Sequence, residues 1–219
     1  MGQFQFINLD QSGGVLTAAL NRPKANAFNE TMIEEWLSVL KIADRDESVR
    51  CLVLTGTGRI FSAGQDVAAV SRGELSLREH LHRTYNRVIL KMHALEKPIV
   101  GAINGPAVGA GLGLARSVEM AFTNRAVTAE EALDWGLVNQ VVPDDRLEEA
   151  VAELATRLAG GPTRAYGLSK RAINRATMAL LKETLEYEAE LQEIAGRTED
   201  HAEGVAAFHE KRDPRFKGK

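Results

Sequence analysis

Two short, mostly apolar runs, each followed directly by a glycine-containing loop, constrain what this chain can fold into. The first run, VRCLVLT, covers Val49–Thr55, and the second, PIVGAI, covers Pro98–Ile103. Runs of this length and composition are typical of strands that are buried on both faces of a parallel sheet. Loops at the carboxyl ends of such strands are where open α/β sheets bind ligands. The pattern therefore predicts an α/β fold with a ligand site at one edge of the sheet.

The flanking segments extend this alternation of strands and helices. Phe4–Leu9 and Val15–Leu20 are apolar, alternating runs separated by Gln11-Ser12-Gly13-Gly14, which predicts a β-hairpin. Apolar residues at helical spacing predict a helix that begins near Asn29 and a long helix over Leu75–Leu95. Further along, the sequence predicts a capping box at Thr128–Glu131, a strand over Val138–Val142, and helices marked by Leu147–Leu158, Leu180–Ile194 and His201–Lys211. We expect residues 1–142 to form the α/β core and residues 143–219 to form a helical region.

Composition narrows the function classes. The 219 residues carry 27 basic and 30 acidic side chains, a net charge of −3, so no basic field points to nucleic acid as a partner. The single cysteine, Cys51, excludes an internal disulfide and a multi-cysteine metal site. No apolar run approaches the roughly 20 residues of a membrane span, and residues 1–10 do not resemble a secretory signal. We therefore expect a cytoplasmic protein without a membrane partner.

The two loops are the candidate site. They read FSAGQD over Phe61–Asp66 and NGPAVGAGLG over Asn104–Gly113. Small residues let the backbone approach a ligand closely, and two such loops side by side can direct two N–H donors at one oxygen, which is an oxyanion hole. For either loop alone, a tight turn is the simpler interpretation. A dinucleotide-binding fingerprint fits poorly, because Leu114 stands where its third glycine belongs.

Several strings in one order resemble the crotonase superfamily of enoyl-CoA hydratases and isomerases. They are NRPKANAF, IFSAGQD, KPIVGAINGPAVGAGLGLA, TAEEALDWGLVNQVVP and FHEKRDPRFKG, and together they span most of the chain. The resemblance implies a spiral of ββα units followed by a helical region that assembles homotrimers or dimers of trimers. It also implies an acyl-CoA thioester as substrate, and no separate cofactor or metal. The residues at positions that match the family's site are Gln65 and Ala110, as backbone oxyanion donors, and Lys24, Ala25, Ala27, Ala63, Gly64, Asp66, Gly109, Phe208 and Lys211, as substrate contacts.

The chain departs from the hydratase pattern at two points. Gly113 stands where hydratases of the family carry their first catalytic glutamate, and on the order of 40 residues of the family pattern are missing after Ala115. The missing stretch would contain a strand and the second catalytic acid, so no residue is assigned that role. Either the protein lacks the stretch, or the molecule carries it after Ala115 in addition to the 219 residues of this sequence. The loss would leave an exposed sheet edge, which favours the second explanation.

The resemblance therefore predicts an acyl-CoA enzyme that stabilises a thioester enolate. With Gly113 in place of a glutamate, double-bond isomerisation is at least as well supported as hydration. A non-catalytic acyl-CoA-binding protein on the same scaffold is the alternative. On the predicted helix over Leu75–Leu95, Tyr85 or Asn86 is a candidate for lining the acyl pocket, whereas His80 and His82 are two residues apart and do not form a metal-binding pair.

Overall fold

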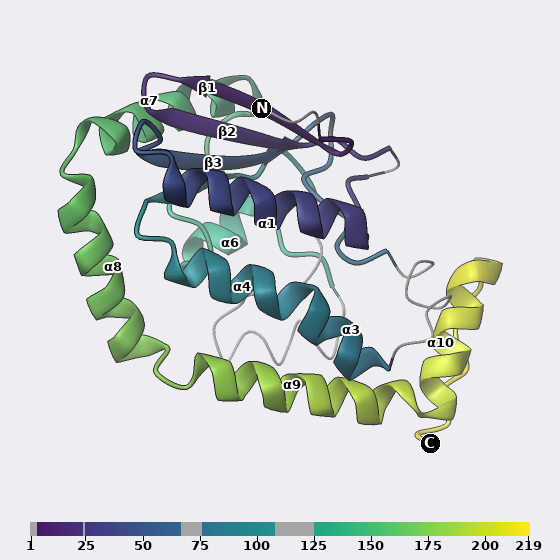
Figure 1. Ribbon diagram of the computed structural model, residues 1–219. Coiled ribbons are helices and arrows are strands. Elements are labelled where there is room, and N and C mark those ends of the chain that lie inside the picture. The colour runs from purple at the N-terminus through teal and green to yellow at the C-terminus, as the bar shows by residue number, and fades with distance from the viewer. Residues whose placement is uncertain (1–3, 24, 67–75, 108–124) are drawn as a thin grey trace.

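The computed structural model describes residues 4–23, 25–66, 76–107 and 125–219 (Figure 1). Within these residues, strands in the order β1-β2-β3-β4 form a four-stranded sheet. β1 and β2 are antiparallel, whereas β2, β3 and β4 run parallel to one another. The strands are β1 (Ile7–Ser12), β2 (Val15–Leu20), β3 (Cys51–Gly56) and β4 (Ile99–Ala102). The expected hairpin and both expected parallel strands are confirmed. The first half of β3 is buried as expected, whereas in β4 only Ala102 is buried and Gly101 is exposed.

The β1–β2 turn explains why the hairpin register is fixed. Ser12 pairs with Val15, so only Gly13 and Gly14 lie in the turn. Both have positive φ, +54° and +82°, which the right-handed twist of the flanking strands favours and which glycine adopts without a steric penalty. Both boundaries of β1 differ from the expected run, because the strand begins at Ile7 rather than Phe4 and ends at Ser12 rather than Leu9. Gln11 and Ser12, expected in the turn, pair with β2.

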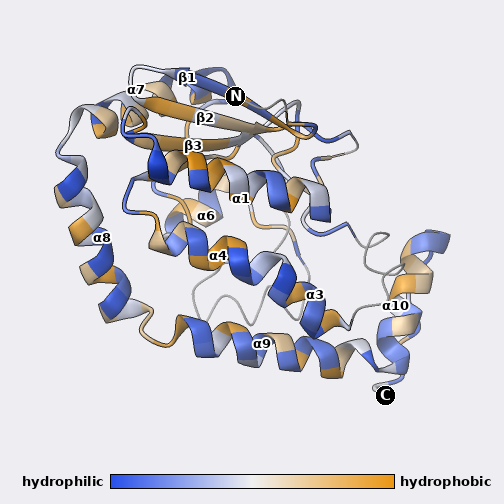
Figure 2. Ribbon diagram, in the orientation of Figure 1, coloured by the Kyte–Doolittle hydropathy of each residue, from blue (hydrophilic) through white to orange (hydrophobic). Residues whose placement is uncertain are grey.

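Helices cover both faces of the sheet. On one face, α1 (Glu30–Arg45) packs with α4 (Tyr85–Ala94), and Asn29 caps α1 by accepting a hydrogen bond from the Met32 N–H. On the other face lies α7 (Leu147–Gly160). Figure 2 shows the apolar residues gathered in β2 and β3. The fully buried side chains of the α1 face include Leu16, Leu20, Trp36, Leu40 and Leu52, and those packed toward α7 include Cys51, Val53, Ala102, Ala155 and Ala159.

The predicted long helix over Leu75–Leu95 is wrong in one respect, because the structure divides it at Thr84. α3 (Leu77–Arg83) ends and α4 begins at this residue, whose ψ of −94° is not helical. The Thr84 hydroxyl donates to the His80 carbonyl at 2.6 Å. A threonine hydroxyl that bonds to the carbonyl four residues earlier bends a helix, and here the bend becomes a break.

The rest of the chain is helical, with one error and one omission in the sequence-based expectation. Val138–Val142 does not form a strand, and α8 was not predicted. The elements are α6 (Ala129–Asp134), which has the expected capping box, η1 (Asp144–Arg146), α8 (Thr163–Thr177), α9 (Leu181–Gly196) and α10 (Glu199–Glu210). After α7, the helices α8 and α9 run along the outer side of α4 and α3 (Figure 1). α7 itself packs on the sheet, so the first helix of the expected helical region contributes to the core.

Polar contacts hold α8 against the C-terminal end of α4, which is why apolar periodicity did not reveal it. The Lys170 ammonium donates to the Met92 and Leu95 carbonyls at 2.9 and 2.8 Å. The Asn174 amide donates to the His93 carbonyl at 3.0 Å. The last carbonyls of a helix have no partner within the helix, so α8 supplies the donors that α4 lacks.

Replacement of Lys170 tests this attachment. We expect Lys170→Met to lower the free energy of unfolding by about 1–2 kcal/mol, because the Met92 and Leu95 carbonyls lose their donor. Urea denaturation of the variant measures the change. Lys182→Met, at an exposed position on α9, is the matched control and should leave the midpoint unchanged. Equal midpoints for the two variants would contradict the role of Lys170.

Candidate active site

Asn26 joins the two segments that carry most of the predicted site residues. Its side chain is 3% exposed, and its amide nitrogen lies within hydrogen-bonding distance of the carbonyls of Thr57, Ile60 and Phe61, at 3.3, 2.9 and 3.3 Å. Its side-chain oxygen accepts from the Arg22 N–H at 3.0 Å. Asn26 has a φ of +53°, a conformation that asparagine tolerates better than most residues. The residue therefore fixes the loop after β2 to the loop after β3.

A short parallel bridge sets the orientation of the Gln65 backbone. Phe28 donates to the Gly64 carbonyl at 2.7 Å and accepts from the Asp66 N–H at 3.0 Å. Because both neighbours of Gln65 are bonded to Phe28, the Gln65 N–H points to the opposite side of the segment. No hydrogen bond from this N–H to any residue that the structure describes is found. Gln65 thus presents a backbone donor away from Phe28.

The start of the second loop lies directly against the first. The Pro106 carbonyl accepts from the N–H groups of Phe61 and Ser62 at 3.1 and 3.3 Å. Ser62 and Ala107 form a second parallel bridge. Gly105 faces the Arg59 carbonyl so closely that a Cβ has no room there. The two loops are therefore adjacent up to residue 107, and Gly109 and Ala110 lie outside the described residues.

Asp66 is held by an ion pair rather than by backbone caps alone. Its carboxylate lies 2.7 Å from the Arg22 guanidinium, and both side chains are 21% exposed. Arg22 also donates to the Ala27 carbonyl at 2.8 Å. The pair ties the loop after β2 to the residue that follows Gln65. A partly buried pair with an additional hydrogen bond is better ordered than a surface pair.

The predicted substrate contacts divide into three groups. Ala25, Ala27, Ala63, Gly64 and Asp66 lie in the two joined segments, where Ala63 donates to the Ala25 carbonyl at 2.9 Å. Lys24 and Gly109 lie outside the described residues. Phe208 and Lys211 belong to the C-terminal end, which Figure 1 places away from the sheet. Beside the first group is a cavity of about 620 Å³, lined by Gln5, Phe6, Asn21, Arg22, Pro23, Ala25, Asn26, Thr57, Gly58, Arg59 and Ile60.

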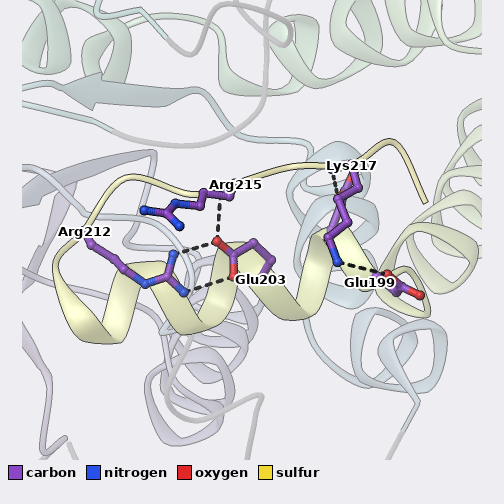
Figure 3. Close-up of a pocket in the computed structure, with 6 residues that line it drawn as sticks. Glu199, Glu203, Arg212, Arg215 and Lys217 are labelled. Atoms are coloured by element: carbon purple, nitrogen blue, oxygen red, sulfur yellow. Dashed lines mark hydrogen bonds and ion pairs between the residues drawn. The ribbon is translucent and has the colours of Figure 1, made fainter.

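The C-terminal end folds back along α10 (Figure 3). Glu203 accepts from the Arg212 guanidinium at 2.6 and 3.0 Å and from the Arg215 N–H at 2.7 Å. Asp200 accepts from the N–H groups of Lys217 and Gly218, both at 2.6 Å. These side chains line a cavity of about 440 Å³. The basic residues of this end are therefore ordered by acidic residues of α10.

The α3–α4 junction places aromatic side chains beside the Gln65 segment. The Tyr85 ring meets the edge of Phe28 at 6.4 Å and of His80 at 6.2 Å, measured between ring centroids. Burial raises the pKa of the Tyr85 hydroxyl, with a smaller contribution from the Asp66 carboxylate, and burial lowers the pKa of His80. Asn86 is buried and donates to the Leu185 carbonyl of α9 at 3.5 Å. Of the two predicted pocket residues, only Tyr85 thus lies next to the Gln65 segment.

Among the described residues, no group of histidine, cysteine, aspartate and glutamate side chains is arranged to hold a metal ion. In the same residues, each helix is too short or too polar to cross a membrane.

A sheet with helices on both faces and adjacent loops at the ends of its parallel strands defines an α/β ligand-binding protein of the crotonase type. The family model for enoyl-CoA hydratase/isomerase matches residues 10–118 and 112–219. The chain belongs to the enoyl-CoA hydratase/isomerase family. The resemblance and the fold class predicted from the sequence are confirmed.

Relatives match the chain over nearly its whole length. The 1,2-epoxyphenylacetyl-CoA isomerase of Escherichia coli is 35% identical, covering 98% of this chain and 99% of the relative. A 4-chlorobenzoyl coenzyme A dehalogenase of Arthrobacter is 32% identical, covering 94% of this chain and 91% of the relative. The crystal structure of an enoyl-CoA hydratase from Mycobacterium avium subsp. paratuberculosis superposes with a TM-score of 0.85 at 26% identity, covering 98% of this chain and all of the other.

The alignment with the isomerase is longer than the chain. It runs over 260 positions, so at least 41 positions of the alignment have no residue of this 219-residue chain. The two ranges that the family model matches overlap at residues 112–118. The isomerase therefore has residues without a counterpart in this chain.

Asn26 provides a direct test of how the two loops are held. We expect Asn26→Ala to lower the free energy of unfolding by about 2–4 kcal/mol, because several carbonyls lose their donor and alanine is strained at positive φ. Thermal and urea unfolding measure the change. Asn139→Ala, at an exposed loop position, is the control. A similar stability for both variants would contradict the role of Asn26.

The C-terminal end makes a prediction about pH. The Arg212 guanidinium and then the Arg215 N–H lower the pKa of Glu203 from 4.5 to about 2. A carboxyl with a lowered pKa stabilises the folded state above its ordinary pKa, so the attachment of this end weakens as the pH falls from 4.5 toward 2. Carbon-detected NMR titration of Glu203 should show the low pKa.

Arg212→Ala should raise the pKa of Glu203 toward its ordinary value, because the largest cause of the shift is removed. Arg146→Ala, which removes an exposed ion pair with Glu149, is the control and should leave the titration of Glu203 unchanged. A Glu203 pKa that does not respond to Arg212→Ala would contradict the fold-back.

Proposed function

We propose that this protein is an acyl-CoA enzyme that stabilises a thioester enolate with backbone N–H donors. The observation that carries the proposal is the orientation of Gln65, whose N–H points away from the Phe28 bridge and bonds to no described residue. A thioester oxygen gains negative charge when a proton leaves the neighbouring carbon. Fixed N–H groups stabilise that charge more in the transition state than in the ground state. Ala110 is the expected second donor, on the loop whose first residues already contact Phe61 and Ser62.

We propose that the two joined segments also supply the substrate contacts. Ala25, Ala27 and Ala63 are small residues in the two joined segments, where the backbone can approach the CoA thioester closely. Lys24 supplies positive charge suited to the CoA phosphates, and Arg22, which is paired with Asp66, lines the cavity of about 620 Å³. Gly64, Asp66 and Gly109 complete the expected contacts.

We also propose that the protein acts as a homotrimer or a dimer of trimers. Large apolar side chains are exposed along the outer helices, namely Ile173, Met178, Leu180, Tyr187, Leu191, Ile194 and Phe208. Exposed apolar surface of this extent marks an interface between proteins. Because the C-terminal end stands away from the sheet, Phe208 and Lys211 contact the ligand only after assembly in this proposal.

The reaction is best described as double-bond isomerisation or hydration of an enoyl-CoA. Gly113, where hydratases of the family have a glutamate, favours chemistry that needs a single acid or base. The relatives include proteins named as an isomerase, a dehalogenase and hydratases, so the family name alone does not select the reaction. The surplus residues of the isomerase alignment fit the junction after Ala115, where the second acid would lie.

Turnover of two substrates tests the function. The protein is incubated with crotonyl-CoA and with a 3-enoyl-CoA, and the absorbance of the conjugated thioester is followed while products are separated by chromatography. Turnover of the 3-enoyl-CoA to the 2-enoyl-CoA establishes isomerisation, and loss of the crotonyl-CoA absorbance with formation of a 3-hydroxyacyl-CoA establishes hydration. Binding of both esters without turnover of either would favour a non-catalytic acyl-CoA-binding protein.

The Gln65 donor can be removed without changing a side chain. An α-hydroxy acid at position 65 replaces the amide with an ester, and we expect kcat/KM to fall about 100- to 1,000-fold. The same replacement at position 28 removes the donor to the Gly64 carbonyl but leaves the Gln65 N–H in place. This control separates loss of the donor from weakening of the bridge. An equal loss of activity in both proteins would contradict the role of the Gln65 N–H.

A further inference from the structure

The Tyr85 hydroxyl is a buried donor that the proposed reaction does not use. Its oxygen is inaccessible to solvent and has no hydrogen-bond partner among the described residues. A buried hydroxyl without a partner destabilises a protein, so such groups are uncommon unless a ligand or water completes them. Tyr85 therefore differs from Asn86, the next residue, whose amide is bonded to α9.

The position of Tyr85 connects it to the proposed oxyanion donor. Its ring packs on Phe28, and the Phe28 backbone holds both Gly64 and Asp66. The Asp66 carboxylate is close enough to affect the ionisation of Tyr85. In Figure 1, the α3–α4 junction lies toward the end of the molecule to which the arrows of β2 and β3 point. Tyr85 thus packs on the residue whose backbone bonds flank Gln65, where the thioester is proposed to bind.

The surroundings of the hydroxyl restrict what it can bind. The rings of Phe28 and His80 pack against Tyr85, which makes the surroundings of the hydroxyl aromatic and largely apolar. Burial keeps the hydroxyl protonated at neutral pH, so it acts as a hydrogen-bond donor and not as a base. A donor in an apolar wall discriminates strongly in favour of a ligand that brings an acceptor oxygen.

We propose that Tyr85 is a specificity-determining residue whose hydroxyl donates a hydrogen bond to an oxygen on the acyl group of the CoA ester. The ligand class is an acyl-CoA that carries a hydroxyl, epoxide or keto oxygen on its acyl chain, in addition to the thioester carbonyl. This inference rests on the proposed function. The relative named 1,2-epoxyphenylacetyl-CoA isomerase acts, by its name, on an ester with such an oxygen, which agrees with this class.

Paired ligands test the proposal. Binding of phenylacetyl-CoA and 2-hydroxyphenylacetyl-CoA, and of butyryl-CoA and 3-hydroxybutyryl-CoA, is measured by calorimetry for the full chain and for Tyr85→Phe. We expect Tyr85→Phe to weaken binding of at least one oxygenated ester about three- to tenfold, which corresponds to one neutral hydrogen bond. Binding of its deoxy partner should change less than twofold. Tyr166→Phe, on α8, is the control and should change neither.

Stability provides the second measurement. If the hydroxyl is reserved for a ligand, Tyr85→Phe leaves the unfolding midpoint of the ligand-free protein unchanged or raises it, because an unpartnered polar group has been removed. A lower midpoint, together with unchanged ligand discrimination, would show that the hydroxyl is bonded within the protein and would overturn the proposal. An equal effect of Tyr85→Phe on both members of each pair would also overturn it.

The two proposals fail in different ways. If the unaltered protein binds none of the four esters, the proposed function fails and the role of Tyr85 fails with it. If the unaltered protein binds the esters and Tyr85→Phe binds them in the same ratio, only the role of Tyr85 fails.

Discussion

The Asn26 carboxamide is the interaction on which the rest of the site depends. Loops carry backbone N–H and C=O groups that no regular ladder satisfies, and a site made of backbone donors needs those groups held in place. Asn26 holds such groups in place, because its buried side chain binds the carbonyls of three residues in the loop after β3. The Phe28 bridge then fixes Gln65, and the Pro106 carbonyl fixes the next loop against Phe61.

The elements that face the sheet were predictable because burial dictates their composition. β2, β3 and α1 have apolar residues at the spacing that their core positions require, and Asn29 provides the cap. The elements that attach through polar groups were not. α8 is joined to α4 by Lys170 and Asn174, and a hydropathy pattern does not register such contacts. Thr84 breaks a helix that its apolar neighbours would continue, through a hydroxyl bond that only the folded chain reveals.

In the candidate site, too, some features could be predicted from the sequence and others could not. The resemblance predicts Ala25, Ala63, Gly64 and Asp66 as substrate contacts, and the structure places them in joined segments. The partner of Asp66 was not foreseen, because Arg22 lies 44 residues earlier and forms its ion pair only through tertiary structure. Asn26 was part of a quoted motif without a role of its own, since its role depends on carbonyls more than 30 residues away.

A site built on backbone donors also explains how one family covers several reactions. An N–H group contributes the same charge stabilisation whichever side chain its residue carries, so the oxyanion donors survive substitution. The side chains around them are then free to differ in acid, base or donor. Relatives at 30 to 35% identity carry the names of an isomerase, a dehalogenase and a hydratase. In the roles that we propose for this chain, the backbone of Gln65 stabilises the charge, and the α3–α4 junction, where the Tyr85 ring packs on Phe28, selects the acyl group.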